Sequence, residues 1–156
     1  MIIRNKTVLF KSFFWILVLI LISQSTVYGP TCLLTDPIGL SEKKAMDFGQ
    51  ITVGFSGGTI DTAGTVTGDV VLFRGPTNGG QAGITACKGE IINYSFVNGS
   101  LTDGTNVMNL TITTAAGSQL IPNSGKFTLN VDGQLIVASV QGAGVYTGSY
   151  TIVVNY

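Results

Sequence analysis

The side chains with the clearest chemical potential are carboxylates, and they are spread along the chain rather than clustered. They are Asp36, Glu42, Asp47, Asp61, Asp69, Glu90, Asp103 and Asp132. A glycosidase needs two carboxylates that face each other across a cleft, and nothing in this spacing favours such a pair. The chain contains no histidine, which excludes Ser-His-Asp and Cys-His catalysis and removes the commonest zinc ligand. Glycine-rich phosphate and dinucleotide motifs are also missing. We therefore expect no enzymatic activity, no metal site and no cofactor.

One glycine-flanked threonine could act as a nucleophile. The stretch Ser56-Gly57-Gly58-Thr59-Ile60 resembles the catalytic threonine motif of bacterial asparaginases. Those enzymes are much longer, and their second Thr-Asp-Lys element does not occur in this chain. A glycine-rich turn that opens a β-strand is the interpretation we prefer.

The two cysteines, Cys32 and Cys87, predict a disulfide. An even number of cysteines in an exported chain usually means that they are paired. Closing this long loop would stabilise the fold by roughly 4 kcal/mol in the chain-entropy model. Two thiols without histidine leave a metal short of ligands. The alternative is a nucleophile with its resolving cysteine, for which the usual C-x-x-C spacing is missing.

The N-terminal region has the layout of a secretory signal peptide. Basic residues precede an unbroken apolar run over residues 13–22, and small polar residues follow it. This run is shorter than the roughly 20 residues that a membrane span requires, and an uncleaved anchor is the alternative. We predict a signal peptide over residues 1–25, with a boundary as late as residue 29, and a single domain over residues 26–156. The mature chain should have no membrane span and should lie in the periplasm, on the cell surface or outside the cell.

The composition indicates a folded domain with few charges. The chain has eight basic and eight acidic residues, which together make up 10% of it, against about a quarter in typical domains. Removing the leader removes three bases and no acid, so five bases minus eight acids leave a net charge of −3. Such a chain has no basic patch for nucleic acid. Its hydrophobic fraction of 45% argues against disorder.

The rest of the chain consists of short β-branched and aromatic runs separated by Gly, Asn and Asp, which predicts an antiparallel β-sandwich or barrel. Residues 41–46 are the one candidate for a helical turn. An Asp-Gly pair at Asp132-Gly133 separates two alternating runs, which predicts a tight hairpin with positive φ at both positions. The expected strands cover residues 46–53, 58–61, 65–73, 83–87, 91–97, 106–114, 126–131, 134–141 and 145–156.

The C-terminal run alternates with period 2 for eleven residues, which predicts a long strand with one buried and one wet face. The buried face should carry Tyr146, Gly148, Tyr150, Ile152, Val154 and Tyr156. Core packing is the expected use of these tyrosines. An exposed aromatic platform that binds sugars is the alternative.

Several segments in order resemble the domain-of-unknown-function 4402 family of exported bacterial proteins. They are residues 46–51 (MDFGQI), 64–66 (GTV), 127–135 (FTLNVDGQL) and 144–156 (GVYTGSYTIVVNY). The resemblance covers roughly residues 40–156. It implies an immunoglobulin-like, pilin-like or fimbria-like β-sandwich of about 7–9 strands without enzymatic activity.

The C-terminus is also similar to that of chaperone–usher pilins, which carry a glycine twelve residues before a near-terminal aromatic residue. Gly144 and Tyr156 have this separation. We therefore expect an exported structural or adhesive subunit of the bacterial surface, a fimbria-like protein that associates by β-strand addition at a sheet edge. Its partners would be other surface or fimbrial subunits, with a periplasmic chaperone and an outer-membrane usher. The alternative is a carbohydrate-binding or other ligand-binding module at the cell surface.

Overall fold

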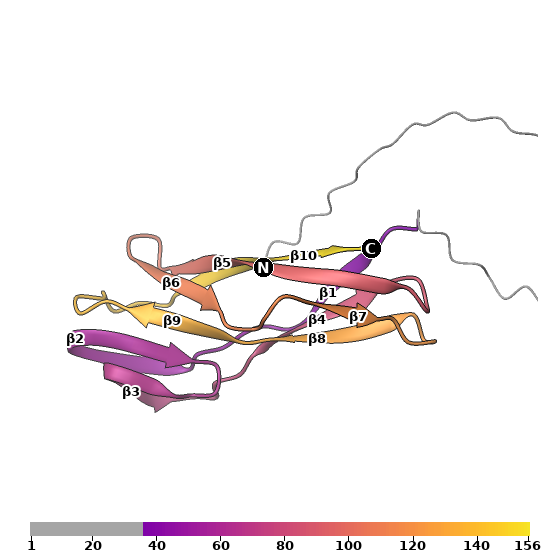
Figure 1. The fold of residues 1–156 in the computed structure, drawn as a ribbon. Coiled ribbons are helices and arrows are strands. Elements are labelled where there is room, and N and C mark those ends of the chain that lie inside the picture. The colour runs from indigo at the N-terminus through magenta and orange to yellow at the C-terminus, as the bar shows by residue number, and fades with distance from the viewer. Residues whose placement is uncertain (1–35) are drawn as a thin grey trace, which may run out of the picture.

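The computed structural model describes residues 36–156, and this part of the chain forms ten β-strands (Figure 1). The predicted signal peptide, its cleavage boundary and Cys32 lie outside the described residues. Between residues 36 and 156 there is no helix that is long and apolar enough to cross a membrane. The strands are β1 Gly39–Lys44, β2 Gln50–Asp61, β3 Val66–Arg74, β4 Gly80–Thr85, β5 Ile91–Thr102, β6 Val107–Ile112, β7 Gly117–Leu120, β8 Lys126–Val131, β9 Gly133–Val137 and β10 Thr147–Asn155.

The strands form two antiparallel sheets, which confirms the predicted β-sandwich. The smaller sheet has the order β1-β4-β8, and the larger has the order β10-β5-β6-β9-β2-β3, with β7 paired to β5. Residues 41–46 were expected as a helical turn, but residues 41–44 belong to β1, where they pair with β4. Tertiary pairing overrides the helix-favouring charged residues here. The short strand β7 has no counterpart among the predicted strands.

β1 and β2 together run antiparallel to β3 and β4 as one long, bent ribbon. Gly39 pairs with Thr85 at one end of the ribbon, and Ile60 pairs with Val66 at the other. An isolated bridge between Asp47 and Asn78 continues the ladder between the two pairs of strands. Because β4 pairs with β8 and the end of β2 pairs with β9, the ribbon passes from the small sheet into the large one.

β8 and β9 are also two parts of one extended segment that changes sheets, so the hairpin predicted at Asp132-Gly133 is wrong. β8 pairs with β4, whereas β9 pairs with β2 and β6. Gly133 is buried and does not have a positive φ. A Cβ at this position would lie 3.0 Å from both Leu110 Cδ1 and Met46 Sδ. Gly133 is therefore explained by close packing between strands and not by a turn, since glycine inside a strand often marks a close approach of neighbouring groups.

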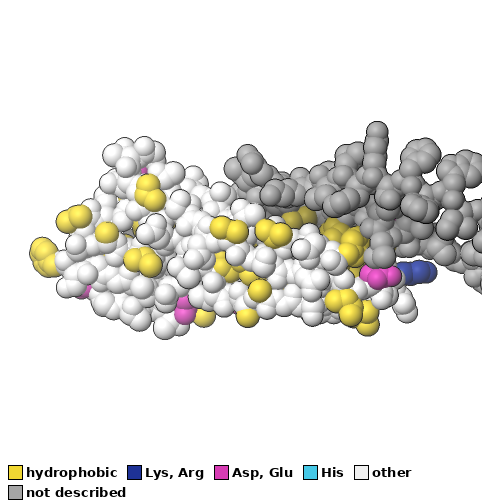
Figure 2. Space-filling model, turned by 45° about the horizontal axis from the view of Figure 1, so that its top comes forward, with side chains coloured by type: hydrophobic (Ala, Val, Ile, Leu, Met, Phe, Trp, Pro, Cys, Tyr) yellow, Lys and Arg dark blue, Asp and Glu magenta, His cyan; other side chains and the backbone are white. Residues whose placement is uncertain are grey.

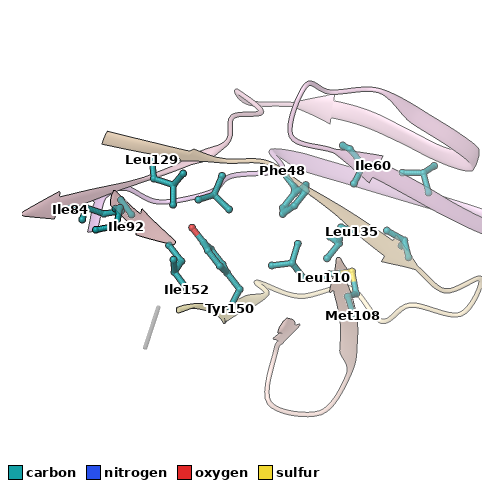
Figure 3. Close-up of a cluster of buried hydrophobic side chains, with 14 of the residues drawn as sticks. Phe48, Ile60, Ile84, Ile92, Met108, Leu110, Leu129, Leu135, Tyr150 and Ile152 are labelled. Atoms are coloured by element: carbon teal, nitrogen blue, oxygen red, sulfur yellow. The ribbon is translucent and has the colours of Figure 1, made fainter. Parts of the chain in front are cut away.

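The hydrophobic core lies between the two sheets and takes side chains from both. Figure 3 shows Tyr150 of β10 pointing into the cluster that includes Ile84, Leu129 and Ile152. The core also receives Phe48, which lies in the ribbon between β1 and β2. Alternate side chains of β10, among them Tyr150 and Ile152, thus hold the last strand against the core.

Candidate functional site

β10 forms one edge of the large sheet, and it contains most of the residues predicted for the C-terminal strand. It pairs with β5 alone among the described strands. Tyr150 and Ile152 are buried, whereas Val154 is half-buried and Gly148 is exposed. All nine residues of β10 are uncharged. β10 therefore combines a firmly packed inner face with a backbone edge that no other described strand pairs with.

Gly148 is needed because β10 approaches β5 closely. A Cβ on Gly148 would overlap the carbonyl oxygen of Ser100, and a Cβ on Gly99 would overlap the carbonyl oxygen of Ser149. Neither glycine has a positive φ. The pairing register shifts between Ser149 and Thr151, so the two glycines permit the close backbone contact beside this irregularity.

Tyr156 fastens the end of β10 to two other parts of the fold. Its hydroxyl accepts a hydrogen bond from the Cys87 backbone N–H at 3.2 Å and donates one to the Asp36 carbonyl oxygen at 3.4 Å. Cys87 itself is 1% exposed. Its predicted partner, Cys32, lies outside the described residues, so the disulfide stays a prediction.

A pocket of about 790 Å³ opens between the first half of β2 and the loop that precedes β10. Residues 50–53 of β2 pair with β3 alone among the described strands, because β9 reaches only residues 58–61. The pocket is lined with hydrophobic residues of the large sheet and with Phe48 from the segment between β1 and β2. They are Phe48, Ile51, Val53, Leu101, Met108, Leu135 and Val137. Among the described residues of the lining, Asp47 is the one that is charged, and its carboxylate accepts a hydrogen bond from the Gly49 N–H at 2.9 Å.

Tyr146 shapes the loop on the open side of this pocket. Its hydroxyl donates to the Gly142 carbonyl oxygen at 2.7 Å and accepts from Gln141 Nε2 at 2.9 Å. Gly144, the glycine of the pilin-like C-terminal pattern, lies in this loop before β10. Tyr146 was predicted on the buried face of the last strand, but it also precedes β10. The loop is thus closed on itself by a half-buried tyrosine.

Asp103, in the turn between β5 and β6, supports the same loop. Its carboxylate accepts hydrogen bonds from the Asn106 side chain at 3.0 Å and from the backbone N–H groups of Asn106 at 2.6 Å and Thr105 at 2.8 Å. These bonds hold the pKa of Asp103 well below its usual range, with the Asn106 side chain as the largest cause. A Cβ on Gly144 would lie 2.8 Å from Asp103 Oδ2, so the loop packs directly on this turn.

The other chemically interesting residues have structural surroundings. Thr59, of the asparaginase-like stretch, lies within β2, where its hydroxyl is hydrogen-bonded to the Thr67 hydroxyl of β3 at 2.7 Å. Asp61 accepts hydrogen bonds from the N–H groups of Ala63 and Thr65 in the turn between β2 and β3. Within residues 36–156, no three His, Cys, Asp or Glu side chains gather into a potential metal site.

The exposed aromatic residues are phenylalanines, which the sequence reasoning did not single out. Phe55 is 98% exposed and Phe73 is 73% exposed, while the tyrosines between residues 36 and 156 are all buried or half-buried. Phe73 also lines the pocket. A sugar-binding platform of tyrosines is therefore not formed by this part of the chain. The sequence feature that indicates the exposure of Phe55 is its position among the small and polar residues 54–59.

Comparison with known proteins identifies a family. The model for a domain of unknown function (DUF4402) matches residues 38–156, which include all ten strands. No curated protein and no solved structure matches the chain. Because the match covers well over half of the chain, the protein belongs to the DUF4402 family.

Proposed function

We propose that this protein is an exported structural or adhesive subunit of the bacterial surface that associates through β-strand addition at a sheet edge. Export rests on the leader-like sequence of residues 1–25. The observation that carries the association is the edge strand β10. An unpaired edge presents a row of backbone N–H and C=O groups, which an added strand can satisfy.

The other edges of the sandwich are protected in ways that β10 is not. β1 carries Glu42, Lys43 and Lys44 and has a register shift. β3 carries Asp69 and Arg74, with a positive φ at Gly68. Charged side chains and bulges are the devices by which natural proteins block pairing at sheet edges.

The remaining two edges are also less suited to pairing than β10. β8 carries Lys126, and β7 is only four residues long. β10 is therefore the longest uncharged edge strand in the described part of the chain. The first half of β2, which pairs with β3 alone, is also uncharged, but it borders the pocket.

The exposed surface of the described residues carries few charges. On the face shown in Figure 2, hydrophobic side chains form small groups among polar ones, and charged side chains are few. Scattered apolar residues are normal on a protein surface, whereas binding patches are contiguous. Proposed partners are other surface or fimbrial subunits, with a periplasmic chaperone and an outer-membrane usher on the export route.

The full chain with its leader, expressed in a bacterial host and followed by cell fractionation and immunogold electron microscopy, tests this proposal. The expected result is protein at the cell surface in assemblies larger than one chain. Protein that stays in the cytoplasm would contradict the proposal. So would protein that is exported but is monomeric both after purification and at the cell surface.

The pocket supports a second candidate, a ligand-binding module. Its volume and its mostly apolar lining, in which Asp47 is the one charged residue among the described ones, suit a neutral apolar molecule. The neutral dye Nile red is a suitable probe. We expect its fluorescence to rise on binding, and this rise to be smaller in a Met108→Trp variant, which enlarges a side chain that lines the pocket. Absence of any dye binding to the folded protein would remove this candidate.

A further inference from the structure

We propose that β10 pairs antiparallel with β10 of a second copy of this chain, which joins the two large sheets into one continuous sheet. This inference rests on the proposed function, since it names the partner for strand addition. It starts from the position of β10 as the last strand of the large sheet, paired on one side with β5 among the strands of residues 36–156.

The absence of charge on β10 disfavours the charged edges of this chain as its partner, and β7, which is also uncharged, is only four residues long. Pairing β10 with β1, β3 or β8 of another copy would place the charges of those strands beside a strand that has none to match them. Partial desolvation of an unmatched charge is unfavourable. β10 paired with β10 brings no charge into the ladder in any register, because the strand consists only of Thr, Gly, Ser, Tyr, Ile, Val and Asn.

The side chains on the two faces of β10 are suited to this pairing. On the outer face, Ser149, Thr151 and Val153 would meet only small polar or β-branched residues of the second copy, and such cross-strand pairs are favourable. On the inner face, the half-buried Val154 would become better covered. An antiparallel pair of identical strands is related by a two-fold axis, and such closed dimers are the commonest oligomers.

Sedimentation of the mature chain over a wide concentration range tests the inference. We expect a reversible dimer, together with β10 amides whose hydrogen exchange slows as the protein concentration rises. Val153 is 44% exposed on the outer face of β10. A lysine there introduces the charge that edge strands use against pairing. Val153→Lys should therefore raise the dimer Kd at least about tenfold.

Val107→Lys is the matched control, because Val107 is 58% exposed and lies on β6, separated from β10 by β5. This variant should dimerise like the unmodified chain, and circular dichroism would verify that both variants are folded. A dimer that responds equally to both lysines would overturn the inference. So would a chain that is monomeric at every concentration, or protection in the monomer of those β10 amides that point away from β5. If the purified chain is monomeric but surface assemblies are present on cells, the β10 pairing fails and the proposed function stands.

Discussion

The Thr62 hydroxyl donates a hydrogen bond to Asp132 Oδ1 across 3.1 Å, and this bond joins the tip of the β2–β3 hairpin to the point where the β8–β9 segment changes sheets. The Thr62 backbone N–H also donates to the Gly133 carbonyl oxygen at 3.0 Å, and the Gly133 N–H donates back to Thr62 Oγ1 at 3.4 Å. Thr62 is 6% exposed. The two crossing segments of the sandwich are therefore fastened to each other at one buried point.

Replacing the Thr62 hydroxyl should destabilise the whole domain. Thr62→Val keeps the shape of the side chain but leaves the buried Gly133 N–H without the Thr62 hydroxyl, which costs about 1–3 kcal/mol of unfolding free energy. Urea unfolding measures this loss. Thr67→Val is the control, because it removes a hydroxyl whose hydrogen bond to Thr59 is exposed, and surface changes of this kind stay within about 0.5 kcal/mol. Equal losses of unfolding free energy in the two variants would show that the Thr62 hydrogen bonds stabilise the fold no more than an exposed hydrogen bond does.

The sequence predicted the strands well but could not reveal where they cross. Alternation over residues 126–131 and 134–137 is a local property, and both segments are strands. In the structure Asp132-Gly133 continues into β9, and this point is hydrogen-bonded to Thr62, which lies 70 residues earlier in the chain. An Asp-Gly pair is compatible both with a hairpin and with a strand that passes from one sheet to the other, so the local pattern does not distinguish the two structures.

Asp103 should make the stability of the domain sensitive to acid. Its pKa is lowered because the Asn106 side chain, and then the Asn106 and Thr105 backbone N–H groups, bond to the ionised carboxylate. A lowered folded-state pKa stabilises the fold at pH values above the unfolded-state pKa, about 3.9. This contribution is lost as the pH falls from there toward the folded-state pKa.

Asp103→Asn should therefore be less stable than the unmodified chain at neutral pH, and the difference should shrink as the pH falls below about 4. Urea midpoints measured from neutral to acidic pH would show this. Glu90→Gln removes the same charge elsewhere and serves as the control. A difference between the Asp103 variant and the unmodified chain that does not change with pH would argue against the ionised carboxylate as the cause.

Gly148→Ala should weaken the attachment of β10 to β5. Strand propensity alone predicts the opposite, because glycine weakens a strand relative to alanine. Here the added Cβ would overlap the Ser100 carbonyl oxygen, and relieving such overpacking costs about 1–3 kcal/mol. The expected result is a lower Tm with faster hydrogen exchange in β10. Ser149→Ala is the neighbouring control and should change stability by no more than about 0.5 kcal/mol. A higher Tm for Gly148→Ala would show that the strands can separate without cost.

The sequence predicted only those features of the candidate site that belong to a single strand. The inward face of β10, with Tyr150 and Ile152, follows from period-2 alternation in the sequence. The open edge of β10 and the pocket beside β2 depend on which strands pair and where each pairing stops. Those relationships join residues far apart in the chain, such as the pairing of Gly58 with Val137, and no local pattern encodes them.

Tyr150 and Tyr156 lie on the same side of the C-terminal segment, but loss of the hydroxyl should change the free energy of unfolding differently at the two positions. The Tyr150 hydroxyl is buried and makes no hydrogen bond with a described residue, whereas the Tyr156 hydroxyl makes two. Removing an unpaired buried hydroxyl is neutral or stabilising, and removing a hydrogen-bonded one costs about 0.5–1.5 kcal/mol. In urea unfolding, Tyr150→Phe should match or exceed the unmodified chain, and Tyr156→Phe should fall below it.

Alkaline titration gives an independent test of the same contrast. Burial raises the pKa of Tyr150, and repulsion from Glu42 adds to the shift. A raised folded-state pKa stabilises the fold at pH values below the unfolded-state pKa, about 10. That stability is lost as the pH rises through the folded-state pKa. Tyr150→Phe should therefore lose less stability than the unmodified chain above about pH 10, and ultraviolet difference spectra should lack its latest-ionising tyrosine. If Tyr150→Phe unfolds in alkali like the unmodified chain, the phenol of Tyr150 is reached by solvent, and the packing of β10 against the small sheet is looser than the structure indicates.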